Sequence, residues 1–372
     1  MRNQMGNVNS VIWTLEPHTK AKHEILRYYL GAWFPILALV HPRIIYVDGF
    51  AGPGEYKEGE AGSPIIALNV AQSHILRSKF RGELVFFFIE IDSARSNNLK
   101  KLINKLELPP NFRVEIECDS FEICIDTVLT DIADRSKKLA PSFFFIDPFG
   151  PTGFSMSLIK RIADQPRSEV LITFNYQPLN QWFLQDASKY KNLDTLFGSD
   201  VWRKALDIGT PREKEEYLRL AYQNALEALG WKVLPFCMIN KHNQTQYYLF
   251  FATKNPLGML AMKRAMWKSA PTGDFKYSDL SNPAQPSMLE AVFEEQYSQQ
   301  LANSIYQNHK GQSISKQTLV QNDLAWHPVC IERHLTKALR ILENETPSLI
   351  TKVEQRKKRE TYPDSCIIIF AP

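Results

Sequence analysis

The chain has 372 residues, of which 44% are hydrophobic and 23% charged, and a net charge of +4. This is ordinary globular composition for one large or two medium domains, and the mildly basic balance permits a polyanionic partner without requiring one. Five cysteines without C-x-x-C spacing argue against a disulfide framework or a metal site and fit a cytoplasmic location. The N-terminus lacks a signal core, and the longest apolar stretch, 33–40, is too short to cross a membrane.

The first half of the chain alternates predicted helices and strands. Residues 18–40 have apolar residues at helical spacing and form the first expected helix. Apolar runs then predict five strands, at 43–48, 83–92, 112–118, 143–146 and 169–174. Helices are expected between them, at 64–79, from 93 to 106 and at 121–138. Near-continuous apolar strands that alternate with helices favour an α/β fold with a doubly wound, mostly parallel sheet.

The sheet is expected to end in an antiparallel hairpin. An aromatic-rich stretch at about 177–212 predicts an irregular insertion over the carboxyl edge of the sheet, and 213–229 is a helix. Residues 229–254 contain two apolar strands around a polar turn, which is typical of a hairpin. A helix near 257–268 follows and carries a methionine stripe that belongs in the core.

A proline-rich segment divides the chain. The first domain is expected to span residues 1–275, the linker 276–287 and a small domain 288–372. The small domain shows one long helix, two short helices separated by a turn, and two strands with a basic tip. This order predicts an α+β winged helix.

Four successive strand ends carry an acid, namely Asp48, Glu90, Asp119 and Asp147. Ligands of open α/β sheets bind at the carboxyl edge, where these side chains meet. Asp48 can pair with an ammonium group, Glu90 can bind both ribose hydroxyls, and Asp119 can hold an adenine amino group. This order of acids favours a class I S-adenosylmethionine site over a nicotinamide site, and no G-x-x-x-x-G-K-[ST] phosphate loop exists.

The glycine-rich loop after the first strand supports this interpretation, because glycines let backbone amides approach a charged, flat ligand. Asp92 competes with Glu90 for the ribose, and capping of a helix is an alternative role for Asp119 and Ser120. The residues expected to contact the cofactor are Asp48, Phe50, Ala51, Gly52, Gly54, Ser63, Glu90, Asp119 and Ser120.

The run FFFIDPFG at 143–150 ends the fourth strand with Asp147-Pro148-Phe149-Gly150. Asp147 and the Pro148 carbonyl can accept the two N–H hydrogens of an exocyclic base amine, while the Phe149 ring stacks on the base. These three residues are the predicted catalytic group. A dehydrogenase would not explain this tetrad.

The stretches HTKAKHEILRYYLGAW, YVDGFAGPGEYKEGEAGSPIIAL, FFFIEID, FFFIDPFG and MKRAMWK resemble the three-Cys-motif partner protein family over nearly the whole chain. The resemblance implies a Rossmann-like class I methyltransferase domain with a C-terminal winged helix, and a three-cysteine radical-enzyme-like protein as a partner. The tetrad is similar to that of tRNA guanine-N2 dimethyltransferases, whereas the glycine loop and Lys22-His23 look distantly like a ribosomal RNA adenine-N6 methyltransferase. Adenine and guanine both stay open, as do DNA and RNA.

The sequence therefore predicts an S-adenosylmethionine-dependent methyltransferase that acts on an exocyclic amine of a nucleic-acid base. The alternative is a non-catalytic nucleic-acid-binding or scaffold partner of the three-cysteine protein. A basic wing suits nucleic acid, although a winged helix that docks on protein is the competing interpretation. The expected substrate-binding residues are Lys22, His23, Gly150, Asn175, Tyr176, Arg356, Lys357, Lys358 and Arg359.

Overall fold

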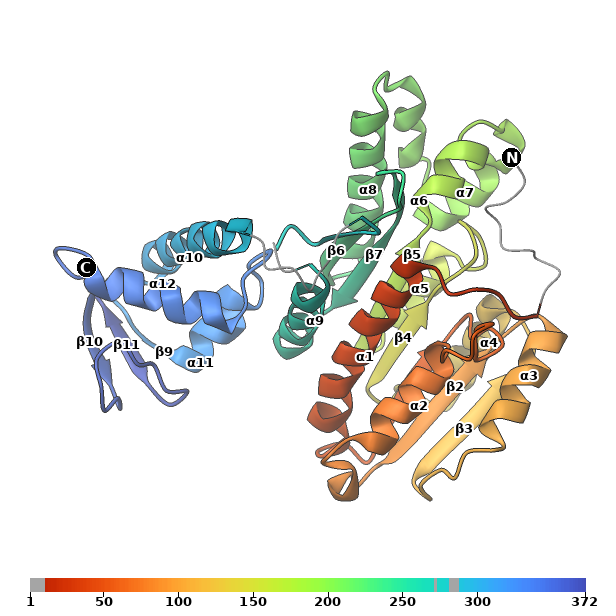
Figure 1. The fold of residues 1–372 in the computed structure, drawn as a ribbon, viewed down its shortest axis with the longest axis horizontal. Coiled ribbons are helices and arrows are strands. Elements are labelled where there is room, and N and C mark those ends of the chain that lie inside the picture. Colours follow the sequence, from red (N-terminus) through yellow and green to blue (C-terminus); the bar gives the residue numbers. More distant parts are fainter. Residues whose placement is uncertain (1–10, 271–272, 281–287) are drawn as a thin grey trace. The chain divides into compact units, whose positions relative to one another are not determined.

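The computed structural model describes residues 11–270, 273–280 and 288–372 (Figure 1). The chain divides into two compact units. The first comprises Met1–Lys254 and Tyr277–Ser281, and the second comprises Asn255–Lys276 and Asn282–Pro372. Part of the expected linker, 281–287, lies outside the described residues.

The first unit contains an eight-stranded sheet in the order β3-β2-β1-β4-β5-β7-β6-β8. Strands β1 to β5 run parallel, and β7 pairs antiparallel with both β5 and β6. This arrangement confirms the predicted, mostly parallel sheet with a terminal antiparallel hairpin. The strands are β1 (Arg43–Asp48), β2 (Glu83–Ile89), β3 (Phe112–Glu117), β4 (Ser142–Ile146), β5 (Ser168–Phe174), β6 (Lys232–Ile239), β7 (Thr245–Thr253) and β8 (Lys276–Ser278).

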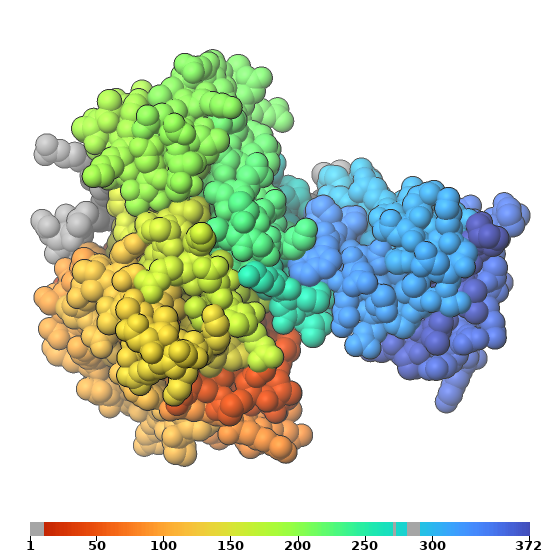
Figure 2. Space-filling view, turned by 180° about the vertical axis from the view of Figure 1, so that it is seen from behind, coloured from red at the N-terminus to blue at the C-terminus, as the bar shows by residue number. Residues whose placement is uncertain are grey.

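Helices cover both faces of this sheet (Figure 1). One face carries α1 (Pro17–Ala38), α2 (Ser63–Ser73) and α3 (Ser93–Ile103), and the other carries α4 (Phe121–Asp134), α5 (Met156–Ala163), α7 (Tyr190–Phe197) and α8 (Pro211–Glu227). Figure 2 shows the second face, where the yellow and green segments that contain these helices form the surface of the unit. The central strand β4 is buried on both sides, which explains its unbroken apolar run.

Two predicted elements differ from the structure. The helix expected over 64–79 ends at Ser73, because His74 adopts an extended backbone, and a short 3₁₀ turn, η1 (Arg77–Lys79), follows. The stretch 177–212 is a series of short helices, where an irregular insertion was expected. Burial of Leu193, Leu196 and Phe197 at helical spacing gives α7 its packed face. The other short elements are α6 (Tyr176–Pro178), η2 (Leu179–Phe183), η3 (Ala187–Lys189) and η4 (Val201–Asp207).

A buried carboxylate, Glu169 on β5, attaches helix α1 to the sheet. Its Oε2 accepts hydrogen bonds from the Tyr29 hydroxyl at 2.7 Å and from Trp33 Nε1 at 2.9 Å, while Oε1 accepts one from Thr253 Oγ1 at 2.6 Å. Burial raises the pKa of Glu169, and the three hydrogen bonds offset part of that effect. The carboxylate therefore links α1, β5 and β7.

The second unit joins helices to a three-stranded antiparallel sheet in the order β10-β11-β9. Two helices come first in the chain and are followed by a strand, two short helices, a longer helix and two strands. The strand β9 was not indicated by the sequence pattern. In α9, the buried Lys263 Nζ donates to the carbonyls of Leu324 and His327. The elements are α9 (Pro256–Ser269), α10 (Met288–His309), β9 (Ser313–Ser315), α11 (Lys316–Leu319), η5 (Val320–Leu324), α12 (Glu332–Asn344), β10 (Ile350–Glu354) and β11 (Ile367–Phe370).

Removal of the Glu169 carboxylate is expected to lower the free energy of unfolding substantially. Glu169→Ala leaves three buried donors without their acceptor, and we expect a loss of about 3 kcal/mol or more. The control Glu83→Ala removes an exposed ion pair with Arg43 and is expected to cost less than about 1 kcal/mol. Denaturant unfolding of both variants measures the difference, and equal losses would contradict the anchoring role.

Candidate active site

The strand register brings three of the predicted acids together at one edge of the sheet. Asp48 lies opposite Phe88 of β2 and Phe145 of β4. Glu90 lies two positions beyond Phe88, and Asp147 lies two positions beyond Phe145. The two acids therefore flank Asp48 on the neighbouring strands. Because side chains alternate along a strand, all three are placed toward the face that α1 covers.

Asp48 is completely buried at the end of β1. Its carboxylate receives hydrogen bonds from the Tyr46 hydroxyl and the Phe50 amide, each at 3.4 Å, and from Ser63. Burial nevertheless raises the pKa of Asp48 to about 7, and the negative charge of Asp147 adds to the increase. A cation bound beside Asp48 would favour its ionised form.

Glu90 is held in one orientation by the backbone. Its Oε2 accepts from the Gly52 amide at 2.9 Å, and its Oε1 accepts from the Asp92 amide at 2.8 Å. Burial raises the pKa of Glu90, and these two bonds together with the charge of Arg95 offset part of the increase. Asp92, the alternative acid, instead caps helix α3 by accepting from the Arg95 amide.

The loop between β1 and α2 depends on its glycines. Gly52 and Gly54 have positive φ angles of 64° and 87°. A side chain at Gly49 would meet the Phe121 ring at 2.5 Å. Phe50 packs against the same ring, and the Ala51 amide donates to the Ile89 carbonyl. The loop thereby contacts both β2 and α4, and Gly52 stays beside Glu90.

Asp119 follows β3, which is the edge strand of the sheet and pairs with β2. Its side chain is exposed and accepts from the Ser120 amide at 2.6 Å. Ser120 caps α4 by accepting from the Ile123 amide. Ser120 thus makes the capping contact that was the alternative weighed from the sequence, whereas Asp119 contacts the amide of this capping residue.

Asp147 forms an ion pair with a residue far away in the sequence. Lys22 Nζ donates to Asp147 Oδ2 at 2.5 Å, and the Lys22 side chain is only 6% exposed. Asp147 Oδ1 forms no hydrogen bond with any described residue. Lys22 also lies 5.0 Å from the centre of the Tyr247 ring. Neighbouring His23 is buried, and burial followed by the charge of Lys22 lowers its pKa to about 3, so it is neutral near pH 7.

The Pro148 carbonyl already has one partner. Asn175 Nδ2 donates to it at 2.8 Å and approaches the Gly150 carbonyl at 3.4 Å. Asn175 therefore supports the Asp-Pro-Phe-Gly turn, and a carbonyl oxygen retains a second lone pair. Tyr176 is buried in the hydrophobic core, so its ring packs under the site.

Phe149 is 64% exposed, as a stacking residue requires. Two residues that the sequence did not single out surround it. The Trp13 ring meets it edge-on at 5.6 Å, and the Arg95 guanidinium lies 5.1 Å from its centre. No spacing or composition signal connects these three positions, which lie on separate segments.

The basic residues of the predicted wing, between β10 and β11, have different environments. Arg356 forms an ion pair with the buried Glu343 at 2.7 Å, and Arg359 approaches the same carboxylate at 3.7 Å. Burial alone would raise the pKa of Glu343, but the hydrogen bonds from Arg356 and Tyr362 and the charges of Arg356 and Arg359 together hold that pKa below its usual value. Lys357 and Lys358 are exposed, and neither ammonium group contacts a partner among the described residues.

The basic residues of α12 are also partly neutralised. Arg333 lies 3.5 Å from Glu294, and Lys337 lies 2.6 Å from Glu295, both on α10. A groove of about 660 Å³ is lined by Glu294, Arg333, Thr336, Lys337 and Arg340. Its lining has mixed charge.

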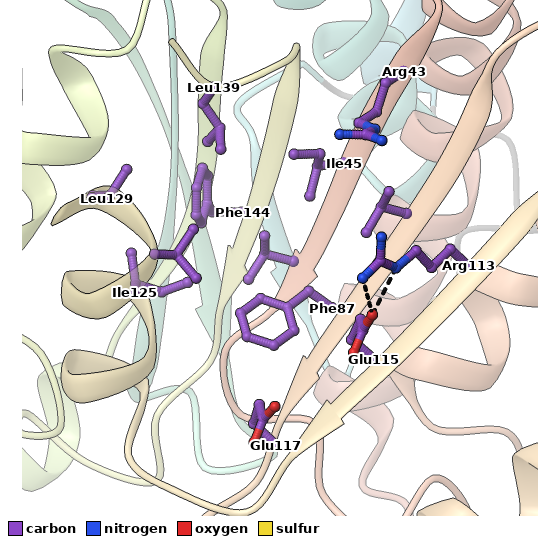
Figure 3. Close-up of a pocket in the computed structure, with 13 residues that line it drawn as sticks. Arg43, Ile45, Phe87, Arg113, Glu115, Glu117, Ile125, Leu129, Leu139 and Phe144 are labelled. Atoms are coloured by element: carbon purple, nitrogen blue, oxygen red, sulfur yellow. Dashed lines mark hydrogen bonds and ion pairs between the residues drawn. The ribbon is translucent and has the colours of Figure 1, made fainter. Parts of the chain in front are cut away.

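A second cavity, of about 320 Å³, lies on the sheet face beside α4 (Figure 3). Apolar side chains such as Ile45, Phe87 and Phe144 line it, and the ion pair of Arg113 with Glu115 lies at its rim. None of the predicted site residues borders this cavity. No cluster of His, Cys, Asp and Glu within the described residues is arranged to hold a metal ion, and none of the described helices has the length and apolarity to span a bilayer.

No family model and no curated protein matches the chain. The solved structures that resemble it weakly include two methyltransferases. Trm1 from Pyrococcus horikoshii, in complex with S-adenosyl-L-methionine, shares 14% identity over 66% of this chain and 57% of its own, with a TM-score of 0.36. The O-methyltransferase from Bacillus cereus, in complex with SAH, shares 11% identity over 64% of this chain and 82% of its own, with a TM-score of 0.34. Likenesses this weak carry no argument about substrate.

The raised pKa of Asp48 predicts a pH-dependent stability. Between pH 3.8, where the unfolded chain ionises this residue, and about 7, the folded chain binds the extra proton. Stability therefore falls as the pH rises through this window and levels off above it. Asp48→Asn cannot titrate at this position. Between pH 4 and 7 the free energy of unfolding of the wild type should therefore fall by on the order of 4 kcal/mol more than that of this variant.

Denaturant unfolding at several pH values tests this prediction. The exposed Asp134→Asn serves as the control, and its curve should run parallel to that of the wild type. If the free energy of unfolding of Asp48→Asn also changed with pH in parallel with that of the wild type, Asp48 would have its ordinary pKa in the folded chain.

Proposed function

We propose that the first unit is an S-adenosylmethionine-dependent methyltransferase that acts on an exocyclic amine of a nucleic-acid base, adenine N6 or guanine N2. The observation that carries this proposal is the environment of Asp147. Lys22 donates to one carboxylate oxygen of Asp147, and the other accepts no hydrogen bond from the residues that the structure describes. The exposed Phe149 ring follows two residues later.

The residues at the edge of β1 and β2 fit S-adenosylmethionine. Asp48 would pair with its ammonium group, and such a cation offsets the cost of ionising a buried carboxylate. Each oxygen of Glu90 already accepts one backbone N–H and can accept a ribose hydroxyl as well. The glycines in the loop between them have no side chain, so the backbone amides of the loop can approach the cofactor closely. When bound, the cofactor supplies an electrophilic methyl group on a sulfonium.

The Asp-Pro-Phe-Gly turn would handle the base. An aromatic amine is a poor nucleophile because its lone pair is delocalised into the ring. Asp147 Oδ1 and the free lone pair of the Pro148 carbonyl would each accept one amine hydrogen, which directs the nitrogen lone pair toward the methyl group. Lys22 keeps the Asp147 carboxylate in place, and Phe149 stacks on the base, worth about 1–3 kcal/mol.

The second unit would supply the nucleic-acid contact as a winged helix. Its helices precede a strand pair whose connecting loop carries Lys357 and Lys358. These two ammonium groups are available for phosphate, whereas Arg356 stabilises the wing through Glu343. Phosphate contacts of this kind position a nucleic acid without reading its sequence.

Substitution of Asp147 is expected to abolish transfer while cofactor binding persists. Labelled S-adenosylmethionine is incubated with host RNA and DNA in separate arms, followed by nucleoside mass spectrometry. The wild type should form N6-methyladenine or N2-methylguanine nucleosides. Asp147→Asn should lower the rate by on the order of 10²–10³-fold, with cofactor affinity by calorimetry nearly unchanged.

Asp134→Asn, on the exposed end of α4, is the matched control and should retain full activity. Full activity of Asp147→Asn would remove Asp147 from the chemistry. If no methylated nucleoside formed in either arm, or if the methyl group appeared on a ring carbon or a ribose, the proposed reaction would be wrong.

Neutralisation of the wing is expected to weaken nucleic-acid binding. Lys357→Gln/Lys358→Gln should lower affinity and reduce the slope of log affinity against log salt by about 1.4 for single strands or about 1.8 for duplex DNA. The matched control is Lys137→Gln/Lys138→Gln, an exposed pair after α4 in the first unit. Equal affinity and slope for the wing variant and the wild type would exclude the wing as a phosphate contact.

A further inference from the structure

Three side chains from separate segments form a cluster at the carboxyl edge of the sheet in the first unit. The Arg95 guanidinium lies 4.9 Å from the centre of the Trp13 ring and 5.1 Å from the centre of the Phe149 ring. The two rings meet edge-on at 5.6 Å, with an interplanar angle of 75°. Guanidinium groups at these distances are attracted to aromatic rings, most strongly where water is excluded.

The segment before α1 brings Trp13 to this place. The Trp13 carbonyl accepts a hydrogen bond from the Lys57 amide at 2.9 Å, and its ring meets Tyr56 edge-on at 6.1 Å. A Cβ placed on Gly52 would lie 3.8 Å from the Trp13 ring. Trp13 therefore rests on the glycine loop, between the expected cofactor contacts and Phe149.

Arg95 has a central position in this group. It lies in the first turn of α3, and its side chain is only 9% exposed despite its charge. Its charge also favours the ionised form of Glu90, the carboxylate expected to hold the ribose. Arg95 thus affects Glu90, on the side of the site expected to hold the cofactor, and Phe149, on the side expected to hold the base.

The contact with Arg95 restricts Phe149. A solvent-exposed phenylalanine on a turn can adopt several rotamers, each of which would place the base differently. The guanidinium lies 5.1 Å from the centre of the Phe149 ring and the centre of the Trp13 ring lies 5.6 Å from it, so Phe149 has two partners while 64% of it stays accessible. Reaction rates are sensitive to misplacement of about 1 Å, so a fixed platform matters.

We propose that Arg95 and Trp13 are positioning residues that hold Phe149 as a rigid stacking platform for the target base. This inference rests on the proposed methyl transfer to a base. It assigns a substrate-positioning role to two residues outside the strand-end acids and the Asp-Pro-Phe-Gly tetrad.

Arg95→Lys tests the role of the planar group, because lysine keeps the charge beside Glu90 but loses the stacking guanidinium. We expect kcat/KM for the nucleic acid to fall about tenfold, the range of one base–aromatic stack. The dissociation constant for S-adenosylmethionine should stay within about threefold of the wild-type value. Trp13→Leu should lower kcat/KM in the same direction, and Trp13→Phe should restore most of it.

A double-mutant cycle with Phe149→Leu separates positioning from a merely structural role. If Arg95 acts through Phe149, the combined variant should be no slower than Phe149→Leu alone. Additive losses, or full activity of both Arg95→Lys and Trp13→Leu, would overturn the inference. If Arg95→Lys does not fold, the cycle of Trp13→Leu with Phe149→Leu decides in the same way.

The outcomes distinguish this inference from the function on which it rests. A wild-type chain that transfers no methyl group to nucleic acid overturns both. A wild-type chain that methylates a base amine while the cycle shows additive losses overturns only the positioning roles.

Discussion

The buried Glu169 carboxylate is the contact on which the candidate site depends. It receives three hydrogen bonds and so fixes α1 against β5 and β7. Two turns before Tyr29, the same helix carries Lys22, which reaches Asp147. The placement of Lys22, which orients Asp147, therefore depends on a carboxylate that lies outside the candidate site.

The site itself combines acids with different tasks in one low-polarity environment. Glu90 is oriented by two backbone amides, Asp147 by a lysine, and Asp48 by weak bonds that do not outweigh its burial. Like charges this close repel each other, and the surrounding donors reduce that repulsion. A cationic ligand would neutralise the remaining negative charge of these carboxylates, which is the electrostatic reason to expect S-adenosylmethionine here.

Much of the fold was predictable because its signals are local. The run Phe143–Ile146 indicates a strand buried on both faces, and the acids follow directly where such strands end. The pairing of Lys22 with Asp147 was not predictable, since 125 residues separate them. Asp119 resembles the other acids in sequence, yet the edge position of β3 exposes it, which only strand order reveals. Likewise, the basic run at 356–359 did not indicate that Arg356 forms an ion pair with Glu343.

The long-range nature of the Glu169 contact also bears on how the chain folds during synthesis. Tyr29 lies 140 residues before Glu169, and Thr253 lies 84 residues after it. Helix α1 is synthesised before β5 and β7, so the hydrogen bonds that attach it to Glu169 and the sheet are complete only after β7 has been made. Until then its apolar face lacks the complete sheet on which it packs, and a non-local topology of this kind folds slowly.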